Sequence, residues 1–515
     1  MISLELLQSS RCRRIMRVVL LAVAMAPTIA ATQPGEFSPH DLALLDRLTW
    51  GVDASSAEHL RSVGMERWLQ EQLHPPASMA LPAAVNAQIE AMPDVHKLPF
   101  DMAASFDQQA KSANQVADPE QKKAAQQVYQ GAMNDRAKQA AARTILRALY
   151  APDQLRERMT WFWFNHFNVH QYKANLRILV GDYVDHAIRP FALGKFRDLL
   201  SATLHHPAML RYLDNADNAA GHINENYARE IMELHTMGVG SGYSQKDVQE
   251  LARILTGVGV SLSPGPPNLK PAYRPLYVRA GLFEFNPNRH DFGDKVFLGH
   301  RIRGSGFGEV EQALDILARE PATARHVSLE LATYFVGDDP PPALVDRMAG
   351  VFRRSDGDIA EVLSALFASR EFEASLGHAF KDPQHYVVSA VRLAYDQNVI
   401  RNTGPMQAWL NRLGEGLYGH ETPDGYPMTS AAWNGPGQMA TRFEIARQLG
   451  SGPAGLFRVE GAPADAPAFP RLENALFDES LARTLQPATQ AALGQATSPE
   501  DWNTLYLASP DFMRR

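Results

Sequence analysis

Apolar residues recur at helical spacing along most of this sequence, and that pattern limits the possible fold more than any other feature. Large apolar residues return every three or four positions from residue 41 to 73, and the pattern resumes at Ile145. The segment from Ser244 to Gly257 has a serine at the N-cap, Asp247 at the capping-box position and a glycine where the helix should stop. The sequence therefore predicts a mainly α protein, an extended multi-helix orthogonal bundle.

Three segments interrupt this pattern. Residues 103–143 are rich in Ala, Gln and Lys, which predicts long exposed helices or a partly mobile helical insertion. Residues 261–300 are rich in Pro and Gly, and the stretch 282–299 has two short β-prone runs around a turn-rich centre, which predicts one small β-hairpin. Residues 451–470 are rich in Gly, Ala and Pro and have the composition of a linker.

The N-terminus has the order of a secretory signal peptide. Four arginines precede an apolar run from Val18 to Ile29, which closes on the small residues Ala30 and Ala31. About a dozen apolar residues are too few to span a bilayer, so we expect cleavage of residues 1–31 and no transmembrane span afterwards. The mature protein should be exported, to the periplasm or beyond the cell.

Cleavage would also change the chemistry open to the chain. The one cysteine, Cys12, would be lost, so any metal site must use nitrogen and oxygen ligands. Four arginines and one acid would leave with it, making the chain more acidic than its formal net charge of −7. An acidic chain is a poor candidate for binding nucleic acid. No serine-hydrolase elbow, phosphate-binding loop, dinucleotide fingerprint or paired-cysteine motif stands out.

The stretch NENYAREIMELH, residues 224–235, predicts an amphipathic helix. Its acids and Arg229 share one arc, and Glu225, Arg229 and Glu233 form a ladder of alternating charge at i, i+4 spacing. This is typical of a solvated helix face. His235 differs because it falls among the apolar positions, where a histidine is most often hydrogen bonded within the core.

Two further segments carry candidate polar residues. His166 and His170 continue an aromatic stripe at i, i+4 spacing, so they could share a metal ion or lie buried in the core. His290 and Asp291 lie in the turn region of the predicted hairpin, where they could bind a metal, orient a base or form an Asx turn.

Eight stretches together resemble a bacterial family known only as domain of unknown function 1800. They run from residue 41 to the C-terminus and are LLDRLTWGVDASSAEHLRSVGMERWLQEQL, DQLRERMTWFWFNHFNV, RPFALGKFRDLLSATLHHPAMLRYLDN, NENYAREIMELHTMGVGSGYSQKDVQELARILTG, HDFGDKVFLG, LATYFVGDDPPPALVDRMAGVF, DGDIAEVLSALFASREF and TPDGYPMTSAAWNGPGQMATRF. The resemblance implies one mostly helical unit, residues 32–515, and no established activity. It also implies an exported partner that resembles phosphatases and sulfatases.

The family's recurrent polar positions fall on a set of residues that excludes His170. They are Asn165, His166, Asn224, Glu225, Asn226, Tyr227, Arg229, Glu230, Glu233, His235, His290, Asp291 and Lys295. We expect His166, Asn226, Glu230 and His235 to meet in one polar pocket with the 290–295 loop at its rim.

Two functions from different classes remain open. The first is a hydrolase or transferase in which His166, Asn226, Glu230 and His235 act, with a divalent metal held by His166, Glu230, His235, His290 and Asp291 if one is used. The second is a non-catalytic envelope or assembly protein that works with the secreted partner. A convergent pocket with buried carboxylates would favour the enzyme, and charges spread over flat helix faces would favour the assembly protein.

Overall fold

The computed structural model describes residues 38–76, 79–458, 469–470 and 472–515, and residues 37–515 form one compact unit. The predicted signal peptide, Cys12 and residues 459–468 of the linker-like segment lie outside the described residues.

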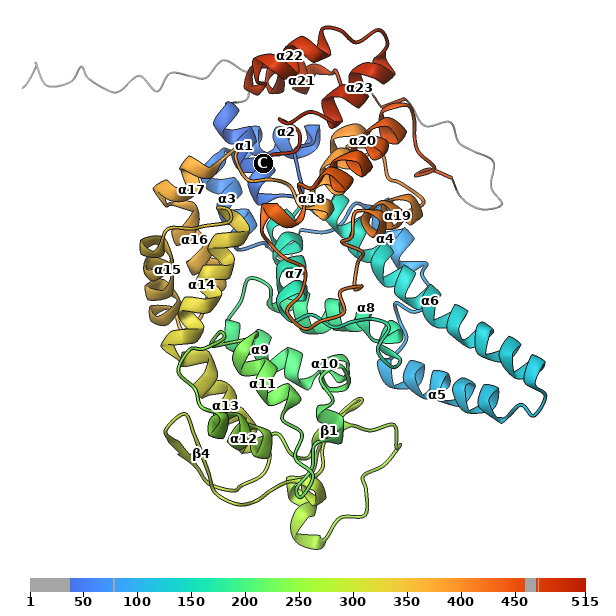
Figure 1. Ribbon diagram of the computed structural model, residues 1–515, viewed down its shortest axis with the longest axis vertical. Helices are drawn as coiled ribbons and strands as arrows, with labels where there is room; N and C mark the ends of the chain where they lie inside the picture. The colour runs from blue at the N-terminus through green and yellow to red at the C-terminus, as the bar shows by residue number, and fades with distance from the viewer. Residues whose placement is uncertain (1–37, 77–78, 459–468, 471) are drawn as a thin grey trace, which may run out of the picture. The chain divides into compact units, whose positions relative to one another are not determined.

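Helices dominate this unit, so the predicted mainly α class is confirmed (Figure 1). The longer helices are α1 (Pro39–Leu48), α2 (Ala54–Val63), α3 (Met65–Leu73), α4 (Ala83–Glu90), α5 (Pro99–Gln115), α6 (Pro119–Tyr150), α7 (Gln154–His166), α9 (Phe196–His205), α10 (Pro207–Tyr212), α11 (Asn226–Glu233), α12 (Gln245–Ile254), α13 (Gly308–Arg319), α14 (Pro321–Phe335), α15 (Pro342–Arg354), α16 (Ile359–Phe367), α17 (Arg370–Ser375), α18 (Pro383–Tyr395), α19 (Gly404–Arg412), α20 (Pro436–Gly450), α22 (Pro487–Leu493) and α23 (Pro499–Leu507). The shortest are α8 (Val180–Asp182) and α21 (Ala475–Glu479).

Local signals set several of these boundaries. The predicted capping box at the start of α12 is present, with Ser244 accepting a hydrogen bond from the backbone of Asp247 and the Asp247 side chain accepting one in return. Proline occupies the first position of α14, where its missing N–H costs no helical hydrogen bond. Asp358 caps α16 by accepting a hydrogen bond from the N–H of Glu361.

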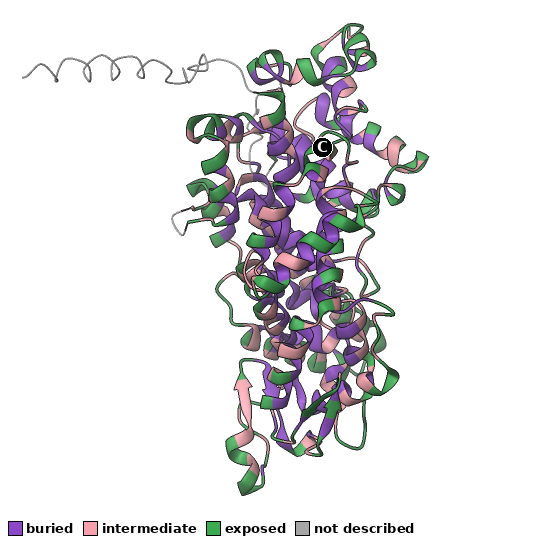
Figure 2. Cartoon of the chain, turned by 90° about the vertical axis from the view of Figure 1, so that its left-hand side faces the viewer, coloured by how far each residue is buried: buried purple, intermediate pink, exposed green. Residues whose placement is uncertain are grey.

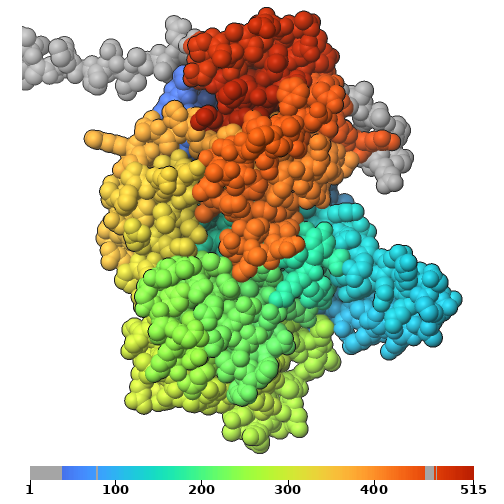
Figure 3. Space-filling model, in the orientation of Figure 1, coloured from blue at the N-terminus to red at the C-terminus, as the bar shows by residue number. Residues whose placement is uncertain are grey.

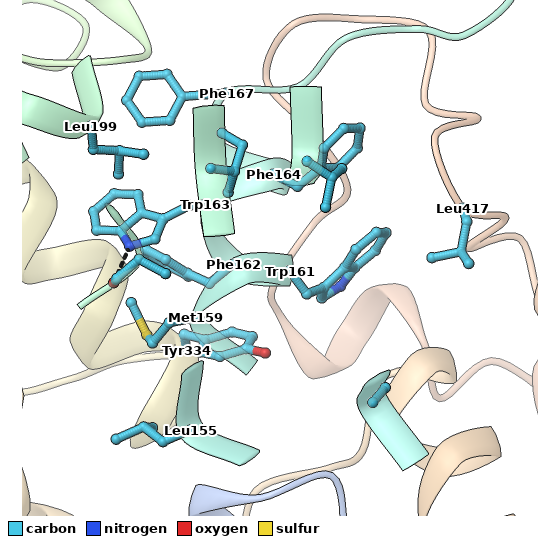
Figure 4. Packing of buried hydrophobic residues seen from close by; sticks show 14 of the residues in the cluster. Leu155, Met159, Trp161, Phe162, Trp163, Phe164, Phe167, Leu199, Tyr334 and Leu417 are labelled. Carbon is cyan, nitrogen blue, oxygen red and sulfur yellow. Dashed lines mark hydrogen bonds between the residues drawn. The ribbon is translucent and has the colours of Figure 1, made fainter. Parts of the chain in front are cut away.

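Helix α7 lies at the centre of the unit and is buried on nearly every side. Trp161, Phe162, Trp163 and Phe164 are each at most 5% exposed, and the sticks in Figure 4 show them pointing in different directions around the helix. The Phe162 ring lies 5.2 Å from that of Tyr334 on α14. Its polar residues Gln154, Glu157 and Arg158 are buried as well, so the single apolar stripe predicted from the sequence understates the burial of α7. Figure 2 shows this buried interior between helices whose outer faces are exposed.

The Ala, Gln and Lys-rich segment forms α5 and most of α6, which pack against each other (Figure 1). Asp118 caps α6 by accepting a hydrogen bond from the N–H of Gln121. The second half of α6 runs into the core, where Ile145 and Leu146 are fully buried.

The predicted hairpin across residues 282–299 is wrong. Its two β-prone runs are β3 (Phe283–Phe285) and β4 (Lys295–Phe297), and they belong to different antiparallel sheets. Strand β3 pairs with β1 (Val258–Val260) and β2 (Val278–Ala280), whereas β4 pairs with β5 (His300–Ile302) through a two-residue turn at Leu298 and Gly299. Closing the two-residue turn between β4 and β5 costs less chain entropy than closing a loop over residues 286–294 would. Other contacts hold residues 286–294 in place.

Candidate functional site

His166, the last residue of α7, makes two hydrogen bonds that define its chemistry. Its Nε2 lies 3.0 Å from the backbone oxygen of His235, and its Nδ1 lies 2.5 Å from Oε2 of Glu330 on α14. A carbonyl oxygen can only accept, so Nε2 carries a hydrogen and donates it. Nδ1 and the Glu330 carboxyl therefore share one proton across a short, charge-assisted contact.

Glu330 is held in its ionised form by the imidazoles around it. Burial alone would raise the pKa of this carboxyl, but the neighbouring His166 and His326 outweigh burial and lower the pKa below its ordinary value. The side chains of Glu330 and His326 are 23% and 21% exposed, whereas that of His166 is 2% exposed. The group therefore reaches solvent along the surface of α14.

His235 is a buried imidazole with no hydrogen bond on its ring. The residue is 1% exposed, its ring lies 6.0 Å from that of His166 and 5.0 Å from that of Phe167, and neither ring nitrogen has a partner among the described residues. Burial, with the nearby charges of His166 and His326, lowers the pKa of His235 well below its ordinary value. The ring is therefore neutral. We call His166, His235, His326 and Glu330 the histidine cluster.

The histidine cluster also ends the helix of the NENYARE stretch. His166 donates to the carbonyl of His235, and Nε2 of His326 lies 3.2 Å from the carbonyl of Leu234, just beyond α11. Carbonyls at the C-terminal end of a helix have no partner within the helix, and the two imidazoles supply one. Part of the role of His166 is thus structural.

Asn226 anchors the opposite end of the same helix. Its Nδ2 donates to the backbone oxygen of Leu213 over 3.1 Å, and its N–H donates to Oδ1 of Asn224 over 3.0 Å. The N–H of Asn224 in turn donates to Oδ1 of the buried Asn218. The recurrent asparagines form one amide network that fixes the first turn of α11.

Glu230 is half-buried on α11, and its side chain has no hydrogen bond to the histidine cluster among the described residues; only its backbone oxygen accepts one, from the N–H of His235 over 3.1 Å. Burial and the negative charges of Glu233 and Asp424 raise its pKa, with partial relief from Arg229. Arg229 pairs with Glu225 at 3.2 Å and with Glu233 at 3.5 Å, which is the predicted surface ladder.

His290 belongs to a second buried cluster. Its Nε2 lies 2.9 Å from Oε1 of Glu309, its Nδ1 lies 2.8 Å from the backbone oxygen of Thr256, and Lys295 Nζ contacts the other oxygen of Glu309. The side chains of His290, Lys295 and Glu309 are all 0% exposed. Burial would raise the pKa of Glu309, but His290, Lys295 and backbone N–H groups lower it overall. We call His290, Lys295 and Glu309 the Glu309 cluster.

The glycine-rich loop at residues 304–309 completes the Glu309 cluster. The N–H groups of Ser305 and Gly306 donate to Oε1 of Glu309 over 2.6 and 2.9 Å. The loop thus binds an anion, and the anion is a carboxylate of the same chain. Asp291 lies outside this cluster, where its side chain pairs with Arg253 at 2.8 Å, and that contact lowers the pKa of Asp291.

The structure therefore brings together two of the four residues expected in the polar pocket, His166 and His235. Asn226 lies at the start of α11, Glu230 is half-buried on the same helix, and His290 and Asp291 bond to other groups. His170 lies beyond the end of α7 and faces the carbonyl of His420, so the i, i+4 pair predicted on one helix does not form. Within the described ranges, no three His, Cys, Asp or Glu residues are placed to hold one metal ion.

Sequence reasoning missed His326, Glu330 and Glu309. The first two lie four positions apart on α14, a helix whose other inward residues are mostly apolar or small. An imidazole and a carboxylate at i, i+4 spacing on such a helix is a signal that could have been found. Glu309 gave no comparable signal because its partners are 14 and 19 positions away.

The recurrent Asn165 has a clear structural task. Its side chain accepts from the N–H of Tyr426 over 2.6 Å and donates to the backbone oxygen of Tyr426 over 2.8 Å. Asn168 donates to the carbonyls of His420 and Thr422. These amides attach the 420–426 loop to the end of α7, and the Tyr212 hydroxyl also donates to the carbonyl of Glu421 in this loop. The space-filling view shows orange residues of the C-terminal half lying against green residues (Figure 3).

A family model described as protein of unknown function (DUF1800) matches residues 43–514. The chain belongs to the DUF1800 family. No curated protein and no solved structure matches this DUF1800 chain significantly. No helix in the described part of this DUF1800 protein is both long enough and apolar enough to cross a membrane.

Proposed function

We propose that this DUF1800 protein is an exported hydrolase or transferase that uses imidazole and carboxylate acid–base chemistry at the histidine cluster. One observation carries the proposal: His235 is a neutral imidazole whose ring nitrogens have no partner in the described part of the chain, beside a His166–Glu330 pair that shares a proton. Perturbed titratable groups of this kind gather at functional sites more often than elsewhere.

The proposed chemistry assigns a role to His235, His166 and Glu330. A neutral imidazole can accept a proton from an attacking water or hydroxyl group, which is the step that His235 would perform. That proton is then delivered to the leaving group, so the ring ends the turnover neutral. Glu330 orients His166 through the Nδ1 contact, as carboxylates do for catalytic imidazoles in other enzymes.

The acid–base scheme requires no metal ion, and the residues first considered as metal ligands divide between two clusters and the surface. His290 uses both ring nitrogens within the Glu309 cluster, and Glu230 is half-buried on α11. A divalent metal with nitrogen and oxygen ligands would therefore need side chains of the histidine cluster to exchange their present partners.

The test is hydrolysis of chromogenic acetate, phosphate and sulfate esters by the wild type, His235→Gln and Glu330→Gln. Removing an acid–base group should lower the rate by about 100-fold or more. The matched control is His205→Gln, a half-buried histidine whose Nδ1 bonds to the Ser201 carbonyl. Near-ultraviolet circular dichroism checks folding. The proposal fails if no ester is cleaved, or if folded variants cleave as fast as the wild type.

The second candidate is a non-catalytic envelope or assembly protein that works with an exported phosphatase-like or sulfatase-like partner. The ladder Glu225–Arg229–Glu233 on the outer face of α11 favours it, because those charges are spread over a half-exposed helix face. A reversal variant, Glu225→Lys with Glu233→Lys, should then weaken capture of the partner while leaving ester hydrolysis unchanged. Cell fractionation tests the proposed export.

A further inference from the structure

A groove between α6 and α19 carries an unusual set of side chains. It encloses about 640 Å³, within the size range of small-molecule sites. Alanines form part of its lining, among them the buried Ala137 and Ala141 on α6 and the exposed Ala408 on α19. The alanine-rich composition of α6 therefore has a tertiary consequence, because small side chains at facing positions leave space between the two helices.

The polar lining of this groove consists mainly of side-chain amides. Six carboxamides line it: Asn134, Gln139, Gln171, Asn402, Gln407 and Asn411. Lys138 is the one charged side chain among the described residues of the lining. A carboxamide both donates and accepts hydrogen bonds, as a hydroxyl group does, so the lining suits a neutral ligand rich in hydroxyl groups.

An aromatic ring is fixed at one end of the groove. Tyr172 is 59% exposed, and the guanidinium of Arg177 lies 5.5 Å from its ring centre. Arg177 is held in turn by Oδ1 of Asn134 at 2.7 Å and Oε1 of Gln130 at 2.6 Å. An exposed tyrosine that is braced in this way offers a rigid apolar surface with little loss of entropy on binding.

We infer that this groove binds a neutral oligosaccharide. Sugar hydroxyls match the carboxamides in donating and accepting hydrogen bonds, and the C–H face of a pyranose ring matches the face of Tyr172. A cationic ligand would find no carboxylate among the described residues of the lining.

The experiment is calorimetric titration of the full chain with cellohexaose, maltohexaose and N-acetylchitohexaose. We expect at least one of them to bind with a Kd between about 1 μM and 1 mM. Tyr172→Ala and Gln407→Ala should each weaken that binding about tenfold. Tyr172→Trp keeps an aromatic face and should retain binding. The matched control, Gln127→Ala, removes an exposed amide on α6 outside the groove and should change nothing.

Two results would overturn the inference. One is that none of the three hexasaccharides binds at about 5 mM. The other is that Tyr172→Ala and Gln407→Ala bind as tightly as the wild type. Ester hydrolysis measured on the same variants keeps this test separate from the proposed acid–base function, because neither Tyr172 nor Gln407 belongs to the histidine cluster.

Discussion

Replacing Glu309 by glutamine should destabilise the protein strongly, because it removes the charge that balances a buried lysine. Lys295 and Glu309 are both 0% exposed, and no other carboxylate contacts Lys295 Nζ among the described residues. Breaking a buried ion pair by removing one partner costs about 3–5 kcal/mol, since the remaining charge stays buried. Glutamine keeps the size of the side chain, so the loss reports charge and not volume.

The expected shift in melting temperature follows from the size of the unit. At about 2.1 cal/mol/K per residue, the roughly 480 residues of the compact unit have an unfolding entropy of about 1 kcal/mol/K. A loss of 3–5 kcal/mol therefore lowers Tm by about 3–5 °C if the unit unfolds cooperatively. Circular dichroism at 222 nm, with a fixed scan rate, measures it.

Two further variants make the Glu309 prediction specific. Asp315→Asn on the same helix removes a carboxylate that is 46% exposed, and a surface pair of that kind contributes at most about 1 kcal/mol. Combining Glu309→Gln with Lys295→Met removes both buried charges and should recover a good part of the lost Tm. Equal Tm values for Glu309→Gln and Asp315→Asn would refute the reasoning.

Acid should remove the same stabilisation in the wild type. Because the pKa of Glu309 is lower in the folded protein, its contribution is complete above the unfolded pKa of about 4.3. It is lost as pH falls through the lower folded pKa. The Tm difference between wild type and Glu309→Gln should therefore shrink below about pH 4.

Three other predictions concern local features. His235 stays neutral in the folded protein, whereas the unfolded residue gains a proton below about pH 6.5. The free energy of unfolding of the wild type should therefore fall by about 1.4 kcal/mol per pH unit below that value. His235→Gln should remove this slope, and equal slopes in Tm between pH 7.5 and 5.5 would contradict it. Gly425→Ala would place a Cβ 2.2 Å from the backbone oxygen of Asn165, at a φ of +73°. Hydrogen exchange in the 420–426 loop should therefore become about tenfold faster. Gly435→Ala, whose Cβ would meet open space, should leave that exchange unchanged. Ser244→Ala should cost about 0.5–2 kcal/mol, seen as faster exchange in α12, and unchanged exchange would show that the cap is not stabilising.

Local sequence determined much of the helical architecture. The capping box at Ser244, the charge ladder around Arg229 and the burial of His235 were all predicted from residues within one or two helical turns. Helical hydrogen bonds, caps and i, i+4 contacts join near neighbours, so a single sequence contains the information that places them. The roles predicted for the site residues remain predictions.

Only the tertiary structure decided which polar groups meet. His166 bonds to Glu330, which lies 164 positions away in the sequence. Strand β3 pairs with β1 and β2, whereas the second β-prone run, β4, pairs with β5. Asn226 and Glu230 lie on the helix of the NENYARE stretch, but in the described residues neither side chain makes a hydrogen bond to the histidine cluster. Such pairings depend on how whole helices pack, because a buried polar group must find a partner wherever the packing places one.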